Sequence, residues 1–274
     1  ATNADGRLTW APDSKQILFT RSGLVDVKGP DMMGGRHKVY DLFVAFTDSA
    51  YANNRLWWVA MTNDMGNRDP EWSADGESIV FWKDANANNV NALMPNYQIA
   101  IMDADGSDLR MIRKDWQQME EDGKGFMWPT RNSKGDIAAV IFVNQKPLGM
   151  VIIPGDNYMV SLDTLIEQAN RNKTKVGPAW SPDGKWLAYI NSDMTNSGLF
   201  LTTPDLKETY LVFAPPVSTN MRVTAPSFSP DSKWLTFSTA DGSVWICDIC
   251  GNGTRRLTGP GLDSSPAWSK AIKK

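Results

Sequence analysis

The sequence predicts an all-β fold: a β-propeller of five complete four-stranded repeats plus a partial sixth. The first supporting observation is a phrase of apolar strand, tight turn and second apolar strand, clearest in residues 178–189. Its Pro-Asp-Gly turn follows from residue chemistry, because Pro presets φ, Asp bonds nearby backbone and Gly accepts a positive φ. The second observation is that this phrase recurs along the chain, and the third is that its spacing suits propeller blades.

The recurrences align on the last residue of the first strand, which we call the anchor. The six anchors are Trp10, Trp72, Arg131, Trp180, Phe228 and Trp268. Successive anchors are 62, 59, 49, 48 and 40 residues apart. Propeller blades span about 40–50 residues, so the first two intervals are expected to carry insertions.

Each interval divides into short strand-like segments separated by turn residues. In the first interval these segments are residues 7–10, 17–20, 40–46 and 55–61, with a polar, glycine-rich excursion at 21–38. The later intervals repeat the pattern, with outer strands predicted at 97–103, 109–113, 137–142, 149–153, 158–162, 198–202, 208–214, 244–249 and 254–257. A last inner strand is predicted at 265–269, without outer strands to follow it.

Two stretches are predicted to contain helix. Residues 114–124 form a polar insertion that is long enough for one helical turn. Further on, apolar residues recur at helical spacing, at Leu162, Leu165, Ile166 and Ala169. Thr164 and Glu167 suit a capping box at the start of that helix.

The bulk composition bounds the class of protein. The 274 residues suffice for one large β domain, so residues 1–274 are taken as a single propeller domain. The net charge of −3 and the lack of a basic block argue against nucleic acid as a partner. No apolar run approaches the roughly 18 residues of a transmembrane segment. Packing between blades accounts for the 12 tryptophans without a ligand.

The repeated phrase carries a family resemblance. Pro-x-Trp-Ser-Pro-Asp-Gly-Lys at 178–185, with the Met-Asp-Ala-Asp-Gly-Ser-Asp-Leu-Arg segment at 102–110, resembles the β-propeller repeat of TolB-like proteins. The resemblance covers nearly the whole chain and implies a propeller, commonly six-bladed, in a periplasmic or otherwise exported protein. Related repeats form the propellers of prolyl-oligopeptidase-like enzymes and of oligogalacturonate lyase, so the resemblance predicts fold far better than function.

The closure of the ring stays open at this point, because six inner strands accompany only five sets of outer strands. A five-bladed ring could close with residues 265–269 as an extra strand, or a degenerate blade could lie within the long intervals. Alternatively, the last blade of a six-bladed ring could be completed by a segment outside this sequence or by another polypeptide. We favour this last interpretation, because an unclosed propeller leaves an exposed strand edge.

Cys247 and Cys250 are the only cysteines and form Cys-Asp-Ile-Cys. A zinc site needs about four ligands, and haem attachment needs His where Gly251 stands. A local disulfide and two free thiols remain as alternatives. His37 is the only histidine, so the histidine-rich metal site of the lyase relatives cannot be carried over. No metal and no cofactor are expected.

The acidic residues do not identify a catalytic site. Asp103, Asp105 and Asp108 lack the bidentate Glu of an EF-hand loop, and Asp105-Gly106 is typical of a hairpin turn. Glycoside hydrolysis would need two carboxyl groups about 5–10 Å apart, and 31 acidic residues leave that pair unidentified. The sequence therefore predicts no enzyme, with a carbohydrate-binding or carbohydrate-active propeller as the alternative.

The insertions carry the functional prediction, because loops on a rigid scaffold commonly bind partners. The first insertion contains Arg36, and the second contains Trp116, Met119 and Trp128. Methionine and aromatic residues suit adaptable protein contacts, although the same residues could simply cap the ring. The predicted function is a protein–protein interaction scaffold or accessory subunit of a larger envelope or periplasmic assembly. Its predicted partners are other protein subunits, one of which could complete the sixth blade.

Overall fold

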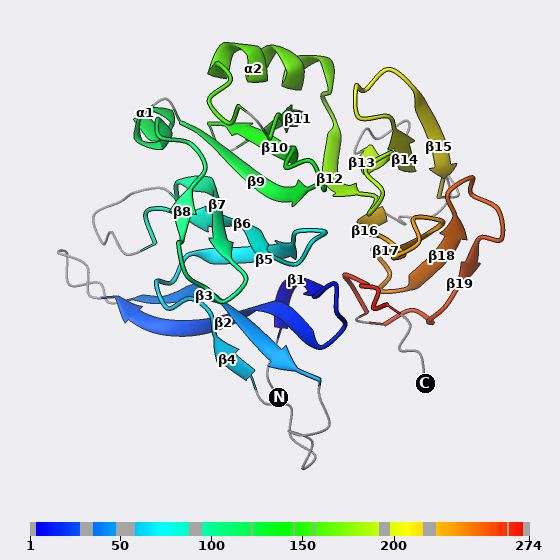
Figure 1. Ribbon diagram of the computed structural model, residues 1–274, viewed down its shortest axis with the longest axis horizontal. Coiled ribbons are helices and arrows are strands. Elements are labelled where there is room, and N and C mark those ends of the chain that lie inside the picture. Colours follow the sequence, from blue (N-terminus) through cyan, green and yellow to red (C-terminus); the bar gives the residue numbers. More distant parts are fainter. Residues whose placement is uncertain are drawn as a thin grey trace.

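The computed structural model describes residues 4–27, 35–47, 58–87, 95–121, 123–144, 146–155, 157–191, 198–215, 223–261 and 263–270. Five antiparallel sheets are arranged around a common centre (Figure 1). Within each sheet the strands follow one another in sequence order, so hairpins connect all neighbours. This arrangement confirms the predicted β-propeller.

Four of the sheets have four strands. The first contains β1 (Ala4–Trp10), β2 (Gln16–Val27), β3 (Gly35–Phe46) and β4 (Trp58–Ala60). The second contains β5 (Asn67–Trp72), β6 (Ser78–Asp84), β7 (Tyr97–Asp103) and β8 (Arg110–Met111). The fourth contains β12 (Lys175–Trp180), β13 (Leu187–Asn191), β14 (Gly198–Thr202) and β15 (Thr209–Phe213). The fifth contains β16 (Val223–Phe228), β17 (Trp234–Thr239), β18 (Val244–Asp248) and β19 (Arg255–Arg256).

The third sheet has three strands, β9 (Lys124–Arg131), β10 (Ile137–Val143) and β11 (Lys146–Ile153). Helix α2 (Leu162–Arg171) covers its outer edge. The Ile152 amide donates to Gln168 Oε1 at 2.8 Å, and the Met150 amide donates to the Asn172 carbonyl at 3.4 Å. The helix therefore takes up edge hydrogen bonds that a fourth strand would otherwise satisfy.

Several predicted elements differ in the structure. Residues 158–162 do not form a strand, because the chain turns there and Ser161 caps α2 by accepting from the Thr164 amide at 3.2 Å. The helix therefore begins at an N-cap, Ser161, that lies one turn before the predicted capping box at Thr164 and Glu167. The short helix predicted in the second insertion is present as α1 (Trp116–Glu121). Of the strand predicted at 55–61, only β4 lies within the described residues.

The partial sixth repeat is also corrected. Residues 265–269 form no strand and pair with no sheet in the described part of the chain. Five sheets are therefore present among the described residues, whereas the sequence predicts five complete repeats and a partial sixth. The predicted excursion at 21–38 is shorter than expected, because β2 and β3 continue through residues 21–27 and 35–38.

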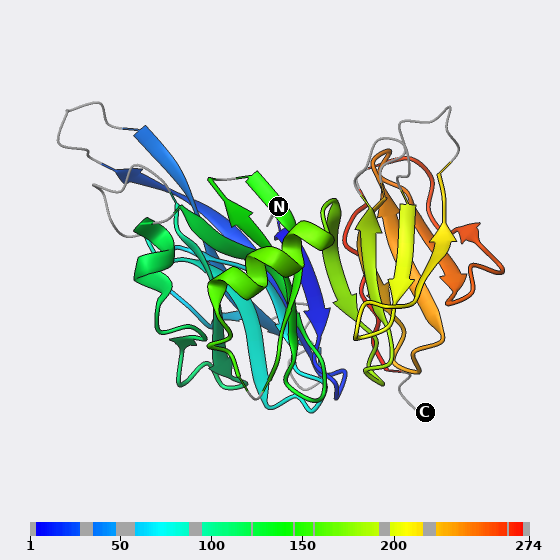
Figure 2. The same cartoon turned by 90° about the horizontal axis from the view of Figure 1, so that it is seen from above.

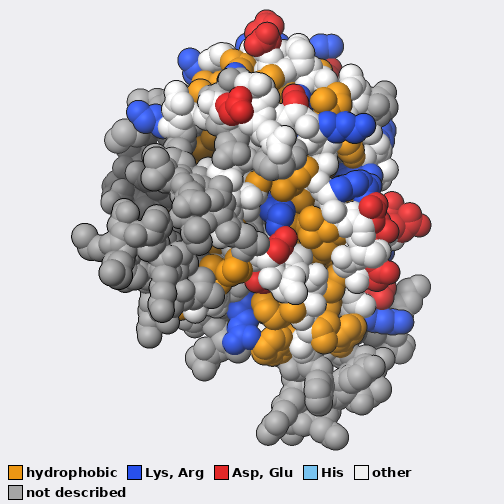
Figure 3. Space-filling view, turned by 90° about the vertical axis from the view of Figure 1, so that its left-hand side faces the viewer, with side chains coloured by type: hydrophobic (Ala, Val, Ile, Leu, Met, Phe, Trp, Pro, Cys, Tyr) orange, Lys and Arg blue, Asp and Glu red, His pale blue; other side chains and the backbone are white. Residues whose placement is uncertain are grey.

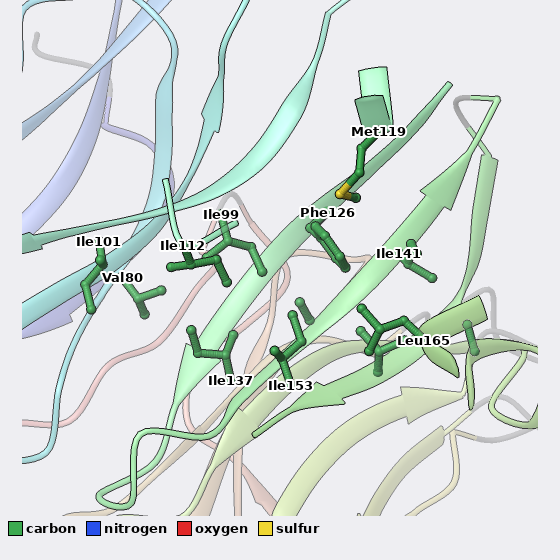
Figure 4. Close-up of a cluster of buried hydrophobic side chains, with 13 residues drawn as sticks. Val80, Ile99, Ile101, Ile112, Met119, Phe126, Ile137, Ile141, Ile153 and Leu165 are labelled. Carbon is green, nitrogen blue, oxygen red and sulfur yellow. The ribbon is translucent and has the colours of Figure 1, made fainter. Parts of the chain in front are cut away.

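The core lies between neighbouring sheets, which pack face to face. The second strands β6, β10, β13 and β17 are buried on both faces over most of their length. A cluster of thirteen buried residues joins the second sheet, the third sheet and α2 (Figure 4). Two further clusters join the first sheet to the second and the fourth to the fifth. Side chains that point to both faces of each sheet therefore hold the ring together.

Candidate functional site

The inner strands of all five sheets surround a cavity of about 380 Å³ at the centre of the ring. Residues of the C-terminal segment complete its wall. All six anchors line the cavity, and four of them are tryptophans: Trp10, Trp72, Trp180 and Trp268. Trp72 and Trp180 are buried, whereas Trp10 and Trp268 are partly exposed. The repeat signature thus places the same type of side chain around one central space.

Bulges shape the inner strands where they approach the centre. The register shifts in β5, β9 and β12 between the fourth and the first residue before the anchor. In these bulges Asp69, Trp128 and Gly177 have φ values of 48°, 55° and 59°. Glycine accepts this conformation readily, but for a bulky residue such as Trp128 it is strained. A bulge re-aims the side chains that follow it, which here brings polar groups toward the axis.

Arg7 bridges three sheets across the cavity. Its Nη1 donates to Glu71 Oε2 of the second sheet at 2.8 Å, and its Nη2 donates to the Pro178 carbonyl of the fourth sheet at 3.3 Å. From the third sheet, Thr130 Oγ1 donates to Glu71 Oε1 at 2.7 Å. The same hydroxyl accepts from the Trp180 amide at 3.3 Å. We call Arg7, Glu71 and Thr130 the central network, since they connect four of the five sheets.

Asp69 extends the central network into the interface between the first two sheets. Its Oδ1 accepts from the Arg7 amide and its Oδ2 accepts from Trp82 Nε1, both at 2.8 Å. The Asp69 amide donates to Thr20 Oγ1 at 3.0 Å. These bonds fix the otherwise unfavourable backbone of Asp69 and hold β1 against β5.

The electrostatics of the central network favour a structural role. Burial raises the pKa of Glu71, while the Arg7 guanidinium and the Thr130 hydroxyl act in the opposite direction. Among the described residues that line the cavity, Glu71 is the one carboxylate. Glycoside hydrolysis needs two carboxyl groups, and both oxygens of Glu71 already accept hydrogen bonds from neighbouring sheets.

Strands β2 and β3 project from the ring as a two-stranded arm (Figure 2). Pairing continues from Gly23↔Val39 to Val27↔Gly35, beyond the point where β1 and β4 pair with this hairpin. We call residues 23–27 and 35–39 the arm. Leu24, on the arm, is 64% exposed.

The predicted contact residue Arg36 lies on the arm, where its backbone pairs with that of Asp26. The neighbouring residues 28–34 of this insertion lie outside the described residues, as does the side chain of Arg36. His37 follows on the same strand. Arg36, which the sequence predicts to lie in a polar loop, is therefore part of a strand pair, and its role in partner contact stays a prediction.

The other three predicted contact residues separate in the structure. Trp116 begins α1, and its side chain is outside the described part. Met119 is fully buried and packs against Phe126 in the core (Figure 4), so the predicted surface role of Met119 is wrong. Trp128 is partly exposed, and its ring meets Phe142 edge-on with centroids 5.9 Å apart. Of these three, Trp128 alone has a described side chain that solvent reaches.

Cys247 and Cys250 are free thiols in the structure, so the alternative of a local disulfide is not realised there. Cys247 is buried between the fourth and fifth sheets, and Cys250 is exposed in the following turn. Burial, assisted by the Asp248 carboxylate, raises the pKa of Cys247 to about 12. A thiol in this state is a poor nucleophile and metal ligand.

The described part of the chain contains no group of three or more His, Cys, Asp or Glu side chains arranged to hold a metal ion. No helix among the described residues is long and apolar enough to span a membrane. On the side of the ring shown in Figure 3, acidic, basic and hydrophobic side chains alternate, and no charge of one sign dominates the described surface.

Arg7, Asp69, Glu71 and Thr130 belong to no recognised motif in the sequence. A signal was present, because these residues stand at fixed offsets from the anchors: three before for Arg7 and Asp69, one before for Glu71 and Thr130. Aligning the repeats on the anchors places all four on inner strands. The alignment does not show that these residues touch one another, because their contacts across the axis depend on how the sheets close into a ring.

No family model matches the chain, and no curated protein matches its sequence. A putative TolB from Agrobacterium tumefaciens matches in structure with a TM-score of 0.65 and 15% identity, over 96% of this chain and 85% of that one. The fold is that of TolB-like propellers. The resemblance predicted from the sequence is thereby confirmed at the level of the fold.

Two further solved structures show how broadly the TolB-like fold is shared. TolB from Acinetobacter baumannii has a TM-score of 0.62 and 16% identity, and this chain, matched over 97% of its length, spans 57% of that one. An oligogalacturonate lyase in complex with manganese has a TM-score of 0.50 and 13% identity, over 85% of this chain and 61% of that one. Identities this low establish the fold and leave function to the residues themselves.

Proposed function

We propose that this chain is a non-catalytic protein-binding module, a scaffold or accessory subunit of a larger assembly in the periplasm or envelope. The observation that carries the proposal is the arm. Over its length two strands pair only with each other within the described residues. A two-stranded hairpin is marginally stable without further packing, so an arm that stands off the ring suits a contact element better than a structural one.

The composition of the arm supports the same proposal. Leu24 is the most exposed large hydrophobic side chain of the described residues. In the strand register its cross-strand neighbour is Lys38, and Arg36 stands two positions before Lys38 in β3. Exposed apolar residues beside basic ones are typical of protein interfaces with a polar rim. The central network supports a non-catalytic role, since it engages the cavity carboxylate Glu71 in holding sheets together.

Removing the arm tests the proposal. Residues 23–39 are replaced by Asn-Gly, a two-residue turn that suits the hairpin between Ser22 and Tyr40. Native mass spectrometry of the tagged chain, isolated from its own cells, should show complexes above 30.4 kDa for the wild type and the free chain for the arm variant. A matched control, Leu257→Ala, changes a residue that is 50% exposed on the fifth sheet and should retain the complexes. Complexes that survive removal of the arm, or a wild-type chain that is always free, would refute the proposal.

The carbohydrate alternative has one observation in its favour, the partly exposed indoles of Trp10 and Trp268 in the cavity wall. Aromatic faces at a concave site suit sugar rings as well as other apolar ligands. Titration calorimetry with an oligogalacturonate and a neutral oligosaccharide distinguishes the two functions. Binding that Trp268→Ala abolishes would favour the carbohydrate function, whereas absence of heat together with arm-dependent complexes would favour protein binding.

A further inference from the structure

The ring has four closely packed junctions between sheets and one that is built differently. Neighbouring inner strands pack together in the pairs β1–β5, β5–β9, β9–β12 and β12–β16. β16 and β1 are not such a pair among the described elements. Residues 263–270 lie between the first and fifth sheets instead (Figure 1). We call this junction the seam.

The C-terminal segment occupies the position of an inner strand in the seam. Trp268 Nε1 donates to the Ser227 carbonyl of the fifth sheet at 3.2 Å. On the other side, the Lys270 amide donates to Ser14 Oγ of the first sheet at 2.8 Å. The junction between the fourth and fifth sheets has an equivalent bond, from the Asp183 amide to Ser232 Oγ at 3.1 Å. Ser14 and Ser232 both stand four residues after their anchors, so the acceptors of the two bonds correspond, while the donors stand two and three residues after theirs.

The sequence of this segment repeats that of an inner strand elsewhere in the ring, and that other copy is paired. Pro-Ala-Trp-Ser occurs at 178–181 and again at 266–269. In the first copy, Ala179 and Trp180 pair with Ala188 and Leu187 of β13. In the second copy, no backbone hydrogen bond joins 266–269 to the described residues. A segment whose backbone has no ladder partner among the described residues can act as a template for strand addition.

The first sheet presents an incompletely buried apolar face to the seam. Leu18 and Leu42 point to the second sheet and are fully buried. Side chains alternate between the faces of a sheet, so Phe19 and Phe43 point the other way, and both are partly exposed. Trp58 continues this face, packed edge-on against Phe43 at 5.1 Å, and is 39% exposed. The second strands of the other sheets have no such half-covered apolar face.

A cation stands at the border of the same face. The Arg21 guanidinium lies 4.5 Å from the centroid of Trp58 and 5.7 Å from that of Phe43. Stacking on aromatic rings leaves the guanidinium edge able to donate to a carboxylate. The face therefore favours an occupant with apolar side chains over Phe19 and Phe43 and an acidic residue opposite Arg21.

The geometry points to the seam as a strand-addition site: an extended strand or hairpin of another protein pairs with residues 266–269 and covers the aromatic face of the first sheet. This inference rests on the proposed function, because it assigns a second contact surface to a protein-binding module. The occupant is defined by its chemistry, as a strand with apolar residues toward Phe19 and Phe43 and an acidic residue opposite Arg21. Its backbone would supply the hydrogen bonds, and Phe19, Phe43 and Trp58 would select its side chains.

The chain itself supplies a rational probe. A synthetic peptide of residues 185–203 contains the two strands, β13 and β14, that follow Pro-Ala-Trp-Ser in the fourth sheet. There, Ala188 and Ile190 pack on the aromatic cluster of the next sheet. Added to the full chain, the labelled peptide should bind in fluorescence anisotropy. Hydrogen exchange should show the amides of Ala267, Trp268 and Ser269 fast in the free chain and protected at least about tenfold in the complex.

Variants of the chain and of the peptide show whether the peptide binds at the seam as an added strand or binds nonspecifically to exposed apolar side chains. Trp58→Ala should weaken peptide binding about tenfold, as loss of a buried aromatic contact does at other interfaces. Tyr210→Ala, at a residue 49% exposed on β15, should leave binding unchanged. A peptide carrying Ala188→Pro should not bind, because Pro breaks the strand ladder. Thermal unfolding confirms that each variant remains folded.

Several outcomes would overturn the inference. They are protection of residues 267–269 in the free chain, equal binding by the proline peptide, equal binding by the Trp58 variant, and a homodimer that fills the seam with a second copy. The arm is intact in all these experiments. Failure of peptide binding would therefore leave the arm-dependent complexes as they are, and loss of the arm would not affect the peptide.

Discussion

Replacing Thr130 by valine should destabilise the centre of the ring without creating a cavity. Valine has nearly the shape of threonine, and Thr130 is fully buried, so the change removes a hydroxyl and little else. That hydroxyl donates to Glu71 Oε1 at 2.7 Å and accepts from the Trp180 amide at 3.3 Å. One substitution therefore breaks the link between the second, third and fourth sheets.

The magnitude follows from the two lost hydrogen bonds. A hydrogen bond to a charged group contributes about 1.5–3 kcal/mol, and a buried donor left unsatisfied costs about 1–3 kcal/mol. The bond from the Trp180 amide is long, so its share lies at the low end. The free energy of unfolding should fall by about 2–4 kcal/mol.

Urea denaturation at neutral pH measures this loss as a shift in midpoint at constant slope. Thr9→Val is the matched control, because Thr9 is on the inner strand of the first sheet and its hydroxyl has no hydrogen bond within the described residues. The control should differ from wild type by less than about 0.5 kcal/mol. If Thr130→Val is no less stable than Thr9→Val, the central network does not hold the sheets together.

Three further changes test other parts of the structure. Burial raises the pKa of Glu71 above its usual value of 4.5 in the folded chain. Glu71 therefore stabilises the folded state at pH values below 4.5, and this stabilisation is lost as the pH rises through the raised pKa. The free energy of unfolding of Glu71→Gln, measured from acidic to neutral pH, should lack this loss. Iodoacetamide should label Cys250 in the folded protein, as read by peptide mass spectrometry, whereas Cys247 should react only after unfolding. Gly149→Ala should lower the stability by about 1–3 kcal/mol in a thermal melt, since its Cβ would lie 2.3 Å from the Ala169 carbonyl oxygen, and Gly259→Ala, with open space around it, should not.

The strands were predictable because their signals are local. The segments predicted at 17–20 and 198–202 lie within β2 and coincide with β14, since alternation and turn residues act over a few neighbours. Residues 158–162 are also mostly apolar, yet they form a turn that leads into another element. Arg113 Nη1 donates to the carbonyls of Tyr158 and Val160, both at 2.9 Å, and this segment leads into α2. The guanidinium that binds this turn comes from 45 residues away in the sequence, so no local pattern reveals the contact.

The arm and the central network were not predictable in the same way. The arm belongs to residues 21–38, which contain four glycines and a proline, a composition typical of loops, so the pairing of 23–27 with 35–39 has no clear local signal. Arg7, Glu71 and Thr130 carry no motif, and they meet only because five inner strands converge on one axis. Met119 shows the reverse error: a polar sequence neighbourhood suggested exposure, but α1 turns that residue into the core.

The central network also bears on whether the seam can open and close. The first sheet is held to the second by the bonds of Arg7 to Asp69 and Glu71, and to the fourth by its bond to the Pro178 carbonyl. None of these bonds crosses the seam. The first sheet therefore keeps its place without packing strand on strand against the fifth, and an added strand could enter or leave without unfolding the ring. Breaking the central network should accordingly lower the free energy of unfolding directly and should weaken strand binding at the seam only through that loss of stability.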